Sequence, residues 1–260
     1  GNIIFKVFGL INLFFGFIQS FIIIFKFKPK TVISFGSYAS FFPLLSCLIL
    51  KPFFKIDLFI HEQNSILGRT NSFYLKYVNK ILLNFDISSK INSKYHLKTH
   101  VVGFPEPYKK DNRIKEYDDL GNKFRIFISG GSQGSEFISK FSTDLIMKID
   151  KENLIKPEYI IQCPKKLINK ISNDLKEINS PIIIKDYFYN IDQILKNTSL
   201  AISRAGAGSI IDLINYKIPS ILIPLPNSKD NHQYYNALIL KNHNLALVVN
   251  QNENLIIKSK

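Results

Sequence analysis

The sequence is short of cysteine, arginine and acidic residues, and these shortages exclude several classes of protein. Only two cysteines, Cys47 and Cys163, occur in 260 residues, and they lie far apart. That excludes a disulfide framework and a cysteine-based zinc site, and it fits a reducing compartment. Only four of the 34 basic residues are arginine. Because specific nucleic-acid readers depend on the planar arginine fork, we expect no nucleic-acid partner.

Acidic residues are scarcest in the first part of the chain, which is therefore strongly basic. Residues 1–104 contain 12 basic and three acidic side chains, a net charge of +9, and the rest contain 22 and 17, a net charge of +5. A basic surface attracts nucleic acid or anionic lipid. The alternative is a lysine-rich composition shared by the whole proteome.

The chain begins with a long segment that has no charge, residues 7–25, bracketed by Lys6 and Lys26. On hydropathy alone this segment fits a transmembrane helix or the core of a signal peptide. Small and polar residues recur in it at steps of three to four, which predicts a helix with a narrow polar stripe and a broad apolar face. Such a helix crosses a membrane, lies buried in a domain, or rests in a membrane surface.

Strand-like and helix-like segments alternate through the rest of the chain in two series. The first series has expected strands at 31–35, 56–60, 80–85 and 100–102, with helical stretches between them, notably at 71–78. The second has expected strands at 124–129, 159–163, 182–185, 200–203, 220–224 and 245–250, and helices at 136–149, 165–177, 191–196, 209–216 and 231–242. Such alternation predicts parallel sheets with both faces covered by helices.

A polar, charged stretch separates the two series and is typical of an interdomain linker. We therefore expect an α/β protein with two lobes, residues 1–107 and 124–260, joined by a linker at 108–123. Ligands of open parallel sheets bind beyond the carboxyl ends of the strands, here in a cleft between the lobes.

A glycine-rich loop, Ser129–Ser135, follows an expected strand and opens a helix. Glycines let backbone N–H groups approach an anion, and the helix dipole favours negative charge there, so Gly130, Gly131 and Ser132 are candidates to hold phosphate. The loop matches neither the Walker pattern nor the dinucleotide fingerprint. The alternative is an ordinary strand–helix turn.

A second glycine-bearing loop, Arg204–Ser209, lies between an expected strand and helix. We expect Asp212 in the first turn of that helix, where its carboxylate would accept hydrogen bonds from both ribose hydroxyls. Ser209 and Asp212 would alternatively form a capping box. Arg204 would lie beside a diphosphate, or form a structural ion pair.

Two polar runs follow strands and suit a sugar, because its hydroxyl groups need both donors and acceptors. His61–Asn64 ends one strand, and Asp230–Gln233 lies where a helix begins. Capping of that helix by Asp230 or Asn231 is also expected. No group of residues has the spacing of a metal site.

Together these motifs resemble the MurG family of bacterial cell-wall glycosyltransferases. Residues 35–40 resemble its FGGYPS loop, 61–64 its HEQN, 130–134 its GGSQG, 202–207 its ISRAGA, and 224–226 with 230–233 its nucleotide-side loop. The resemblance runs in order from Asn2 to Asn250. It implies the GT-B fold, with two Rossmann-like lobes, and transfer of GlcNAc from UDP-GlcNAc to undecaprenyl-linked lipid I, giving lipid II for peptidoglycan, with inversion and with no metal or cofactor.

The resemblance also implies roles for individual residues. Phe188 would meet the uracil, Ala207 to Asp212 the diphosphate and ribose, and Asn64 and Gln233 the donor sugar, with His61 the nearest remaining base. The expected substrate-binding residues are Asn64, Gly130, Gly131, Ser132, Phe188, Arg204, Ala207, Gly208, Ser209, Ile210, Ile211, Asp212 and Gln233. The family's helix at residues 7–25 docks on an anionic membrane without crossing it, so we expect a peripheral protein of the cytoplasmic membrane face.

The sequence also departs from the family pattern. The GGTGGH loop, which carries the family's favoured catalytic base, and the C-terminal helices have no counterpart, so we expect truncation at both ends and little or no transferase activity. Ser37 and Ala39 replace a glycine and a proline, Asp212 replaces glutamate, and Pro107 replaces an arginine. The alternatives are a non-catalytic remnant that still binds UDP-sugar, another GT-B enzyme acting on a membrane glycolipid, and a basic RNA-binding or membrane-anchoring module.

Overall fold

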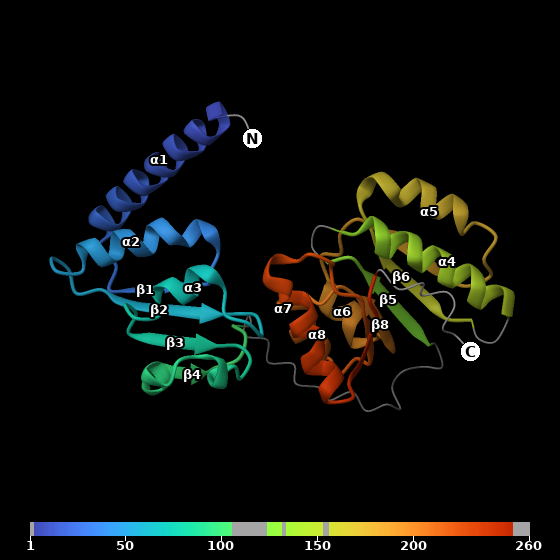
Figure 1. The fold of residues 1–260 in the computed structure, drawn as a ribbon. Coiled ribbons are helices and arrows are strands. Elements are labelled where there is room, and N and C mark those ends of the chain that lie inside the picture. Colours follow the sequence, from blue (N-terminus) through green and yellow to red (C-terminus); the bar gives the residue numbers. More distant parts are fainter. Residues whose placement is uncertain (1–2, 106–123, 132–133, 153–155, 252–260) are drawn as a thin grey trace. The chain divides into compact units, whose positions relative to one another are not determined.

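The computed structural model describes residues 3–105, 124–131, 134–152 and 156–251, and of residues 3–8, 10 and 11 only the backbone (Figure 1). The chain divides into two compact units, residues 1–105 and 106–260. The expected linker at 108–123 lies outside the described residues. Each unit contains one parallel sheet, as the alternating pattern predicts.

The first unit is built on a four-stranded sheet in the order β1-β2-β3-β4, all parallel. Its elements are α1 (Ile3–Phe27), β1 (Thr31–Ser34), η1 (Tyr38–Ser40), α2 (Phe41–Leu50), β2 (Asp57–Glu62), α3 (Arg69–Tyr74), β3 (Lys80–Leu83), η2 (Ser88–Lys90), η3 (Ser93–Lys98) and β4 (Thr99–Val101). Leu58, Ile60 and Ile81 from the sheet pack with Leu44 and Cys47 of α2, and all five side chains are completely or almost completely buried. The Tyr74 hydroxyl donates to the Phe41 carbonyl oxygen at 2.7 Å and ties α3 to α2.

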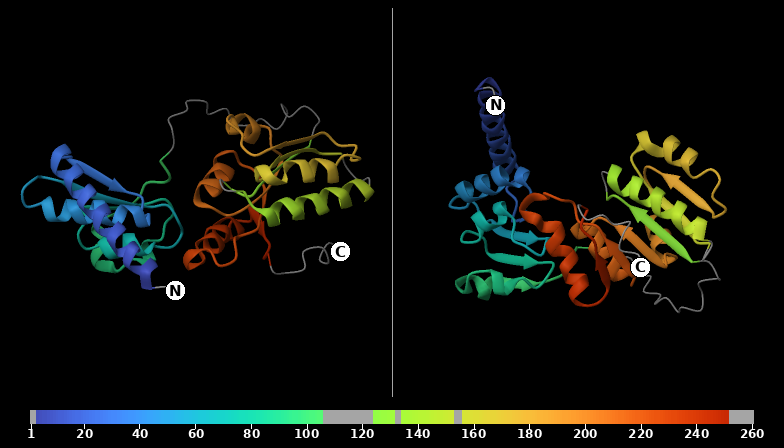
Figure 2. Two further views of the ribbon diagram at one scale, coloured as in Figure 1. Left: turned by 90° about the horizontal axis from the view of Figure 1, so that it is seen from above. Right: turned by 45° about the vertical axis from the view of Figure 1, so that its right-hand side comes forward.

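Helix α1 packs against α2, where the rings of Phe17 and Phe42 lie 6.0 Å apart (Figures 1 and 2). Much of the rest of α1 is uncovered: Phe14 is 61% exposed, Phe15 58% and Ile23 58%. Within the described residues, no helix combines the length and the apolar character needed to cross a membrane.

The second unit is built on a six-stranded sheet in the order β10-β9-β8-β5-β6-β7, all parallel. Its strands are β5 (Arg125–Ser129), β6 (Glu158–Gln162), β7 (Ile182–Lys185), β8 (Leu200–Ser203), β9 (Ser220–Leu222) and β10 (Ala246–Val248). Its helices are α4 (Glu136–Glu152), η5 (Lys165–Leu167), α5 (Ile168–Asp174), α6 (Ile191–Lys196), α7 (Ala207–Asn215), η6 (Lys229–Asn231) and α8 (His232–Asn242). Helix α4 lies beside α5, and α7 beside α8 (Figure 2).

The strand order of the second unit indicates where a ligand would bind. From β5 the chain builds outward through β6 to β7, then returns through α6 to β8 on the other side of β5 and builds outward again to β10. Because right-handed crossovers put the two series of helices on opposite faces, the loops diverge between β5 and β8. The carboxyl ends of these two strands are therefore the expected place for a ligand.

Candidate functional site

Polar residues end the central strands of the second sheet in one row. The strand register pairs Ser203 of β8 with Ser129 of β5, and Ser129 with Gln162 of β6. Gln162 in turn pairs with Lys185 of β7. Neighbouring strands lie about 4.8 Å apart, so these side chains form a polar edge above an apolar sheet.

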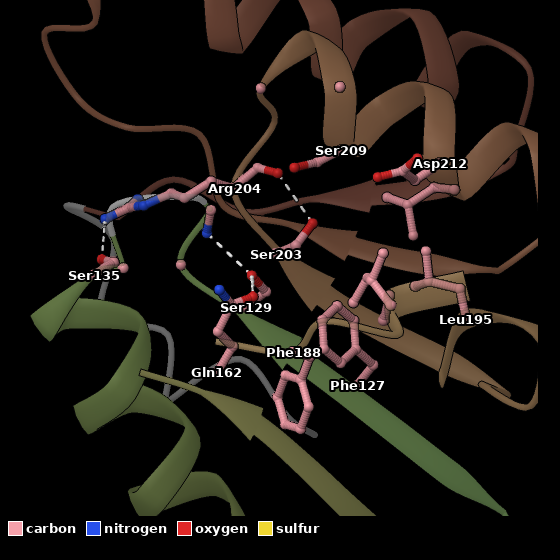
Figure 3. Close-up of a pocket in the computed structure, with 18 of the residues that line it drawn as sticks. Phe127, Ser129, Ser135, Gln162, Phe188, Leu195, Ser203, Arg204, Ser209 and Asp212 are labelled. Carbon is pink, nitrogen blue, oxygen red and sulfur yellow. Dashed lines mark hydrogen bonds between the residues drawn. The ribbon is translucent and has the colours of Figure 1, made fainter. Parts of the chain in front are cut away.

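A pocket of about 550 Å³ opens over this edge (Figure 3). Its lining comes from the loops after β5, β7, β8 and β9, from strands β5, β6 and β8, and from helices α6, α7 and α8. Of the expected site residues it takes in Gly130, Gly131, Phe188, Arg204, Gly208, Ser209, Asp212 and Gln233. Ala207, Ile210 and Ile211 are not in the lining, and Ile210 is fully buried with its N–H bonded to the Gly206 carbonyl oxygen at 3.0 Å. Ser132 lies outside the described residues.

The loop between β5 and α4 has a conformation that requires glycine. Gly131 has a φ of +82° and Gly134 a φ of +71°, in the left-handed region that side chains disfavour. A Cβ on Gly130 would lie 2.2 Å from the backbone nitrogen of Ser135. Because α4 is 17 residues long and begins at Glu136, its N-terminal N–H groups and dipole favour an anion beside this loop.

Arg204 is a brace in the pocket wall. Its guanidinium donates to the carbonyl oxygens of Ile223 (3.0 Å) and Pro224 (3.2 Å), to Ser135 Oγ (2.8 Å) and to Gln251 Oε1 (2.7 Å). The side chain is 5% exposed, and burial lowers the pKa of its guanidinium. No carboxylate of the described residues forms a salt bridge with it, so the expected structural ion pair is wrong there. The positive charge nevertheless lies beside the glycine loop, where it would attract an anionic ligand.

Helix α7 begins earlier than the sequence pattern suggested. Its first residue is Ala207 and its N-cap is Gly206, which has no side chain to cap with. The expected capping box of Ser209 and Asp212 is therefore wrong, and Asp212 lies in the second turn rather than the first. Asp212 still lines the pocket, on the same side as Ser209 (Figure 3).

The loop after β7 provides an aromatic floor. Phe188 is 9% exposed, and its ring meets that of Phe127 edge to face, with the centroids 6.5 Å apart. Tyr187 also lines the pocket and is 57% exposed. Phe127, Gln162 and Tyr187 were not expected from the sequence, because a single aromatic or amide residue at a strand end carries no motif.

Gln233 reaches the pocket from the start of α8. Its Oε1 accepts from the Leu225 N–H at 3.0 Å, which ties it to the loop after β9. Asp230 and Asn231 both have positive φ values, and Asn231 is the N-cap residue of α8. The Asn231 side chain makes no capping hydrogen bond, so the expected capping by Asn231 is wrong.

The polar run at the end of β2 is largely structural. His61 is 3% exposed and its Nε2 lies 2.9 Å from the Gly103 carbonyl oxygen. A carbonyl oxygen only accepts, so Nε2 donates to it, and Nδ1 is then the unprotonated nitrogen of the neutral ring. Nδ1 is buried and has no hydrogen-bond partner among the described residues, so it is shielded from a substrate hydroxyl. Glu62, also 3% exposed, accepts from the Asn64 N–H and Nδ2, the Gly68 N–H and Asn71 Nδ2 at 2.8–3.3 Å. These bonds fix the orientation of Asn64.

Comparison with known protein families gives two matches. The N-terminal domain model of glycosyltransferase family 28 matches residues 4–83, and the C-terminal domain model of the same family matches residues 125–258.

Individual proteins are similar to the chain over most of its length. An enzyme of Wolbachia pipientis subsp. Culex pipiens, named UDP-N-acetylglucosamine--N-acetylmuramyl-(pentapeptide) pyrophosphoryl-undecaprenol N-acetylglucosamine transferase, is 35% identical over 229 residues, covering 88% of the chain and 64% of the enzyme. A Rickettsia bellii enzyme of the same name is 31% identical, covering 89% and 65%. The chain therefore spans about 64% of the length of these relatives.

Solved structures resemble the chain in fold. Acinetobacter baumannii MurG matches with a TM-score of 0.71 and 19% identity, covering 90% of the chain and 64% of MurG. Staphylococcus aureus MnaA, solved with UDP, matches with a TM-score of 0.60 and 12% identity, covering 91% and 66%.

Proposed function

Because this chain belongs to glycosyltransferase family 28 and has its GT-B fold, we propose that it binds UDP-GlcNAc and serves in transfer of GlcNAc to undecaprenyl-linked lipid I, the step that forms lipid II of peptidoglycan. The pocket at the β5/β8 reversal carries this proposal. It combines a glycine loop at the start of a long helix, a carboxylate and an aromatic floor in one cavity. Those are the groups that a diphosphate, a ribose and a base each require.

The pocket supports an orientation for the nucleotide. The diphosphate would lie against the Gly130 and Gly131 loop, where Arg204 adds positive charge, and the uracil would lie near Phe188. Asp212 would accept from the ribose hydroxyls. At about 550 Å³ the pocket is within the size range of small-ligand sites.

The proposed reaction inverts the anomeric carbon in one displacement. A base removes the proton of the acceptor 4-hydroxyl, the oxygen attacks the anomeric carbon, and the bond to the diphosphate breaks. The departing UDP carries new negative charge, which the loop N–H groups and the α4 dipole stabilise. We assign the base to no described side chain, because Nε2 of His61 donates to the Gly103 carbonyl oxygen and Nδ1 is buried.

The exposed face of α1 supports peripheral attachment to an anionic membrane. Phe14, Phe15 and Phe25 are all more than half exposed, and Lys26 and Lys28 lie at the end of the helix. Apolar side chains that enter the interface, with lysines beside them, bind anionic lipid without spanning it. The acceptor is a lipid, so attachment at the cytoplasmic face would bring the chain to its substrate.

Calorimetric titration tests donor binding, with ADP as the control nucleotide. We expect UDP and UDP-GlcNAc to bind and to slow hydrogen exchange at Gly131 and at 206–212, and ADP to bind at least tenfold more weakly. Absence of any effect at saturating UDP-GlcNAc contradicts the proposal.

Two further assays separate the alternatives. Lipid II formation by this chain would exclude the non-catalytic remnant, whereas UDP binding without turnover would favour it. Turnover with a different sugar nucleotide, and none with UDP-GlcNAc, would favour another GT-B enzyme. Co-sedimentation with vesicles that contain phosphatidylglycerol tests attachment, and Phe14→Ser with Phe15→Ser should reduce it.

A further inference from the structure

The end of β6 carries a residue that the proposed nucleotide site does not use directly. We propose that Gln162 is a positioning residue that holds the phosphate-side loop after β5 and the base-side loop after β7 at a fixed separation. This inference rests on the proposed function, because it concerns how the same pocket selects a ligand that has both a base and a diphosphate.

Gln162 lies between the two loops that it joins. Strand β6 pairs with β5 on one side and with β7 on the other, and Gln162 is its last residue. Its Oε1 lies 3.2 Å from Ser129 Oγ, and its Nε2 lies 3.3 Å from the Asp186 carbonyl oxygen. Ser129 opens the glycine loop and lies beside Gln162 (Figure 3). Asp186 comes directly after β7 and opens the loop that contains Phe188.

The hydrogen bonds can run in one direction only. The Asp186 carbonyl oxygen only accepts, so the Gln162 N–H₂ must face it and Gln162 Oε1 must face Ser129. The Ser129 hydroxyl therefore donates to Oε1, and its oxygen accepts from the Gly131 N–H at 3.1 Å. The relay therefore begins at the Gly131 N–H and ends at the backbone of the base-side loop.

This relay gives Gln162 an effect that depends on the ligand. Of these two loops, uridine contacts only the base-side loop, and inorganic pyrophosphate contacts only the phosphate-side loop. UDP needs both loops at the correct distance, so its affinity is higher when the two loops are held in position before it binds. Loss of the relay should weaken UDP binding while leaving each half-ligand nearly unaffected.

The test compares three ligands on five proteins: the wild type, three single variants and one double variant. Gln162→Met keeps the length of the side chain but removes both hydrogen bonds, and Ser129→Ala breaks the relay at its other end. Gln193→Met is the matched control, because Gln193 is exposed on α6 outside the pocket lining. Uridine, pyrophosphate and UDP are titrated by NMR against each variant, and thermal melting confirms that each is folded.

We expect Gln162→Met to weaken UDP about tenfold, uridine and pyrophosphate each less than about twofold, and Gln193→Met to match the wild type. Combining Gln162→Met with Ser129→Ala should weaken UDP no more than about twofold beyond the stronger single effect, since both interrupt one relay. Unchanged UDP binding, or equal weakening of all three ligands, overturns the role of Gln162. If the wild type itself fails to bind UDP, the proposed function falls instead, and this inference with it.

Discussion

Gly130→Ala is the sharpest test of the glycine loop. A Cβ at this position would lie 2.2 Å from the Ser135 backbone nitrogen, 2.6 Å from the Gly134 carbonyl carbon and 2.7 Å from Ser135 Cβ. The nearest of these is more than 1 Å short of ordinary contact, and two of the three are backbone atoms that cannot turn aside. Ser135 must therefore move, and its Oγ accepts from both Arg204 Nη2 and the Ile138 N–H.

Overpacking of this kind typically costs about 1–3 kcal/mol. For a unit of this size we expect the melting temperature to fall by roughly 3–10 °C. Gly206→Ala is the control for stability, since its Cβ would meet only Ser209 Oγ, at 3.9 Å, and its φ is −65°. We expect the control to stay within about 0.5 kcal/mol, because the weaker N-cap preference of alanine is offset by a less flexible unfolded chain.

The assays are urea unfolding followed by tyrosine fluorescence and calorimetric titration with UDP. The Gly130→Ala protein should also bind UDP at least tenfold more weakly, because the loop N–H groups no longer point at the phosphates. If Gly130→Ala is as stable as Gly206→Ala and binds UDP like the wild type, the loop is not the tight turn described above.

Four other predictions concern buried groups. Arg204→Lys should cost at least about 1.5 kcal/mol in urea unfolding, because one ammonium cannot serve four acceptors; a smaller loss refutes the brace. Glu62→Gln should cost about 1.5–3 kcal/mol, because an amide N–H₂ would face converging N–H donors, and unchanged stability would show that these bonds contribute little. Burial raises the pKa of Tyr159 to about 12. The contribution of the protonated hydroxyl to the free energy of unfolding is therefore complete below pH 10, and it falls by up to about 1.4 kcal/mol per pH unit between pH 10 and 12. The free energy of unfolding of Tyr159→Phe, measured against pH, should lack that slope. Burial raises the pKa of Cys47 to about 11 and also that of Cys163, so Ellman's reagent should label neither thiol in the folded chain and both in urea.

The sequence predicted the elements best where short apolar runs lie between strong turn signals. The strands at 182–185 and 200–203 and the helix at 191–196 have the predicted bounds. Helix α2 was expected only as a helical stretch without bounds, because Phe41–Leu50 is almost wholly apolar and so has no helical period to detect. The predicted helix at 165–177 is shorter, a 3₁₀ turn followed by α5.

The site was predictable where a motif is contiguous and not where it depends on register. The glycine loop and the Arg204–Ser209 loop were both predicted as binding loops, and they share one pocket because β5 and β8 are neighbours in the sheet. Gln162 could not be identified, because its importance comes from pairing beside Ser129, 33 residues earlier. The turn that holds Asp212 was misplaced because the N-cap of α7 is Gly206 and not a polar residue.

The way Arg204 is held has a consequence for divergence. Two of its four acceptors are main-chain carbonyls, at Ile223 and Pro224, which every amino acid supplies. Substitutions at those two positions therefore preserve both hydrogen bonds to Arg204, provided that the backbone conformation is unchanged. Selection on this part of the pocket would act on Arg204 and Ser135. Distant homologues should therefore retain that pair while the residues at positions 223 and 224 vary.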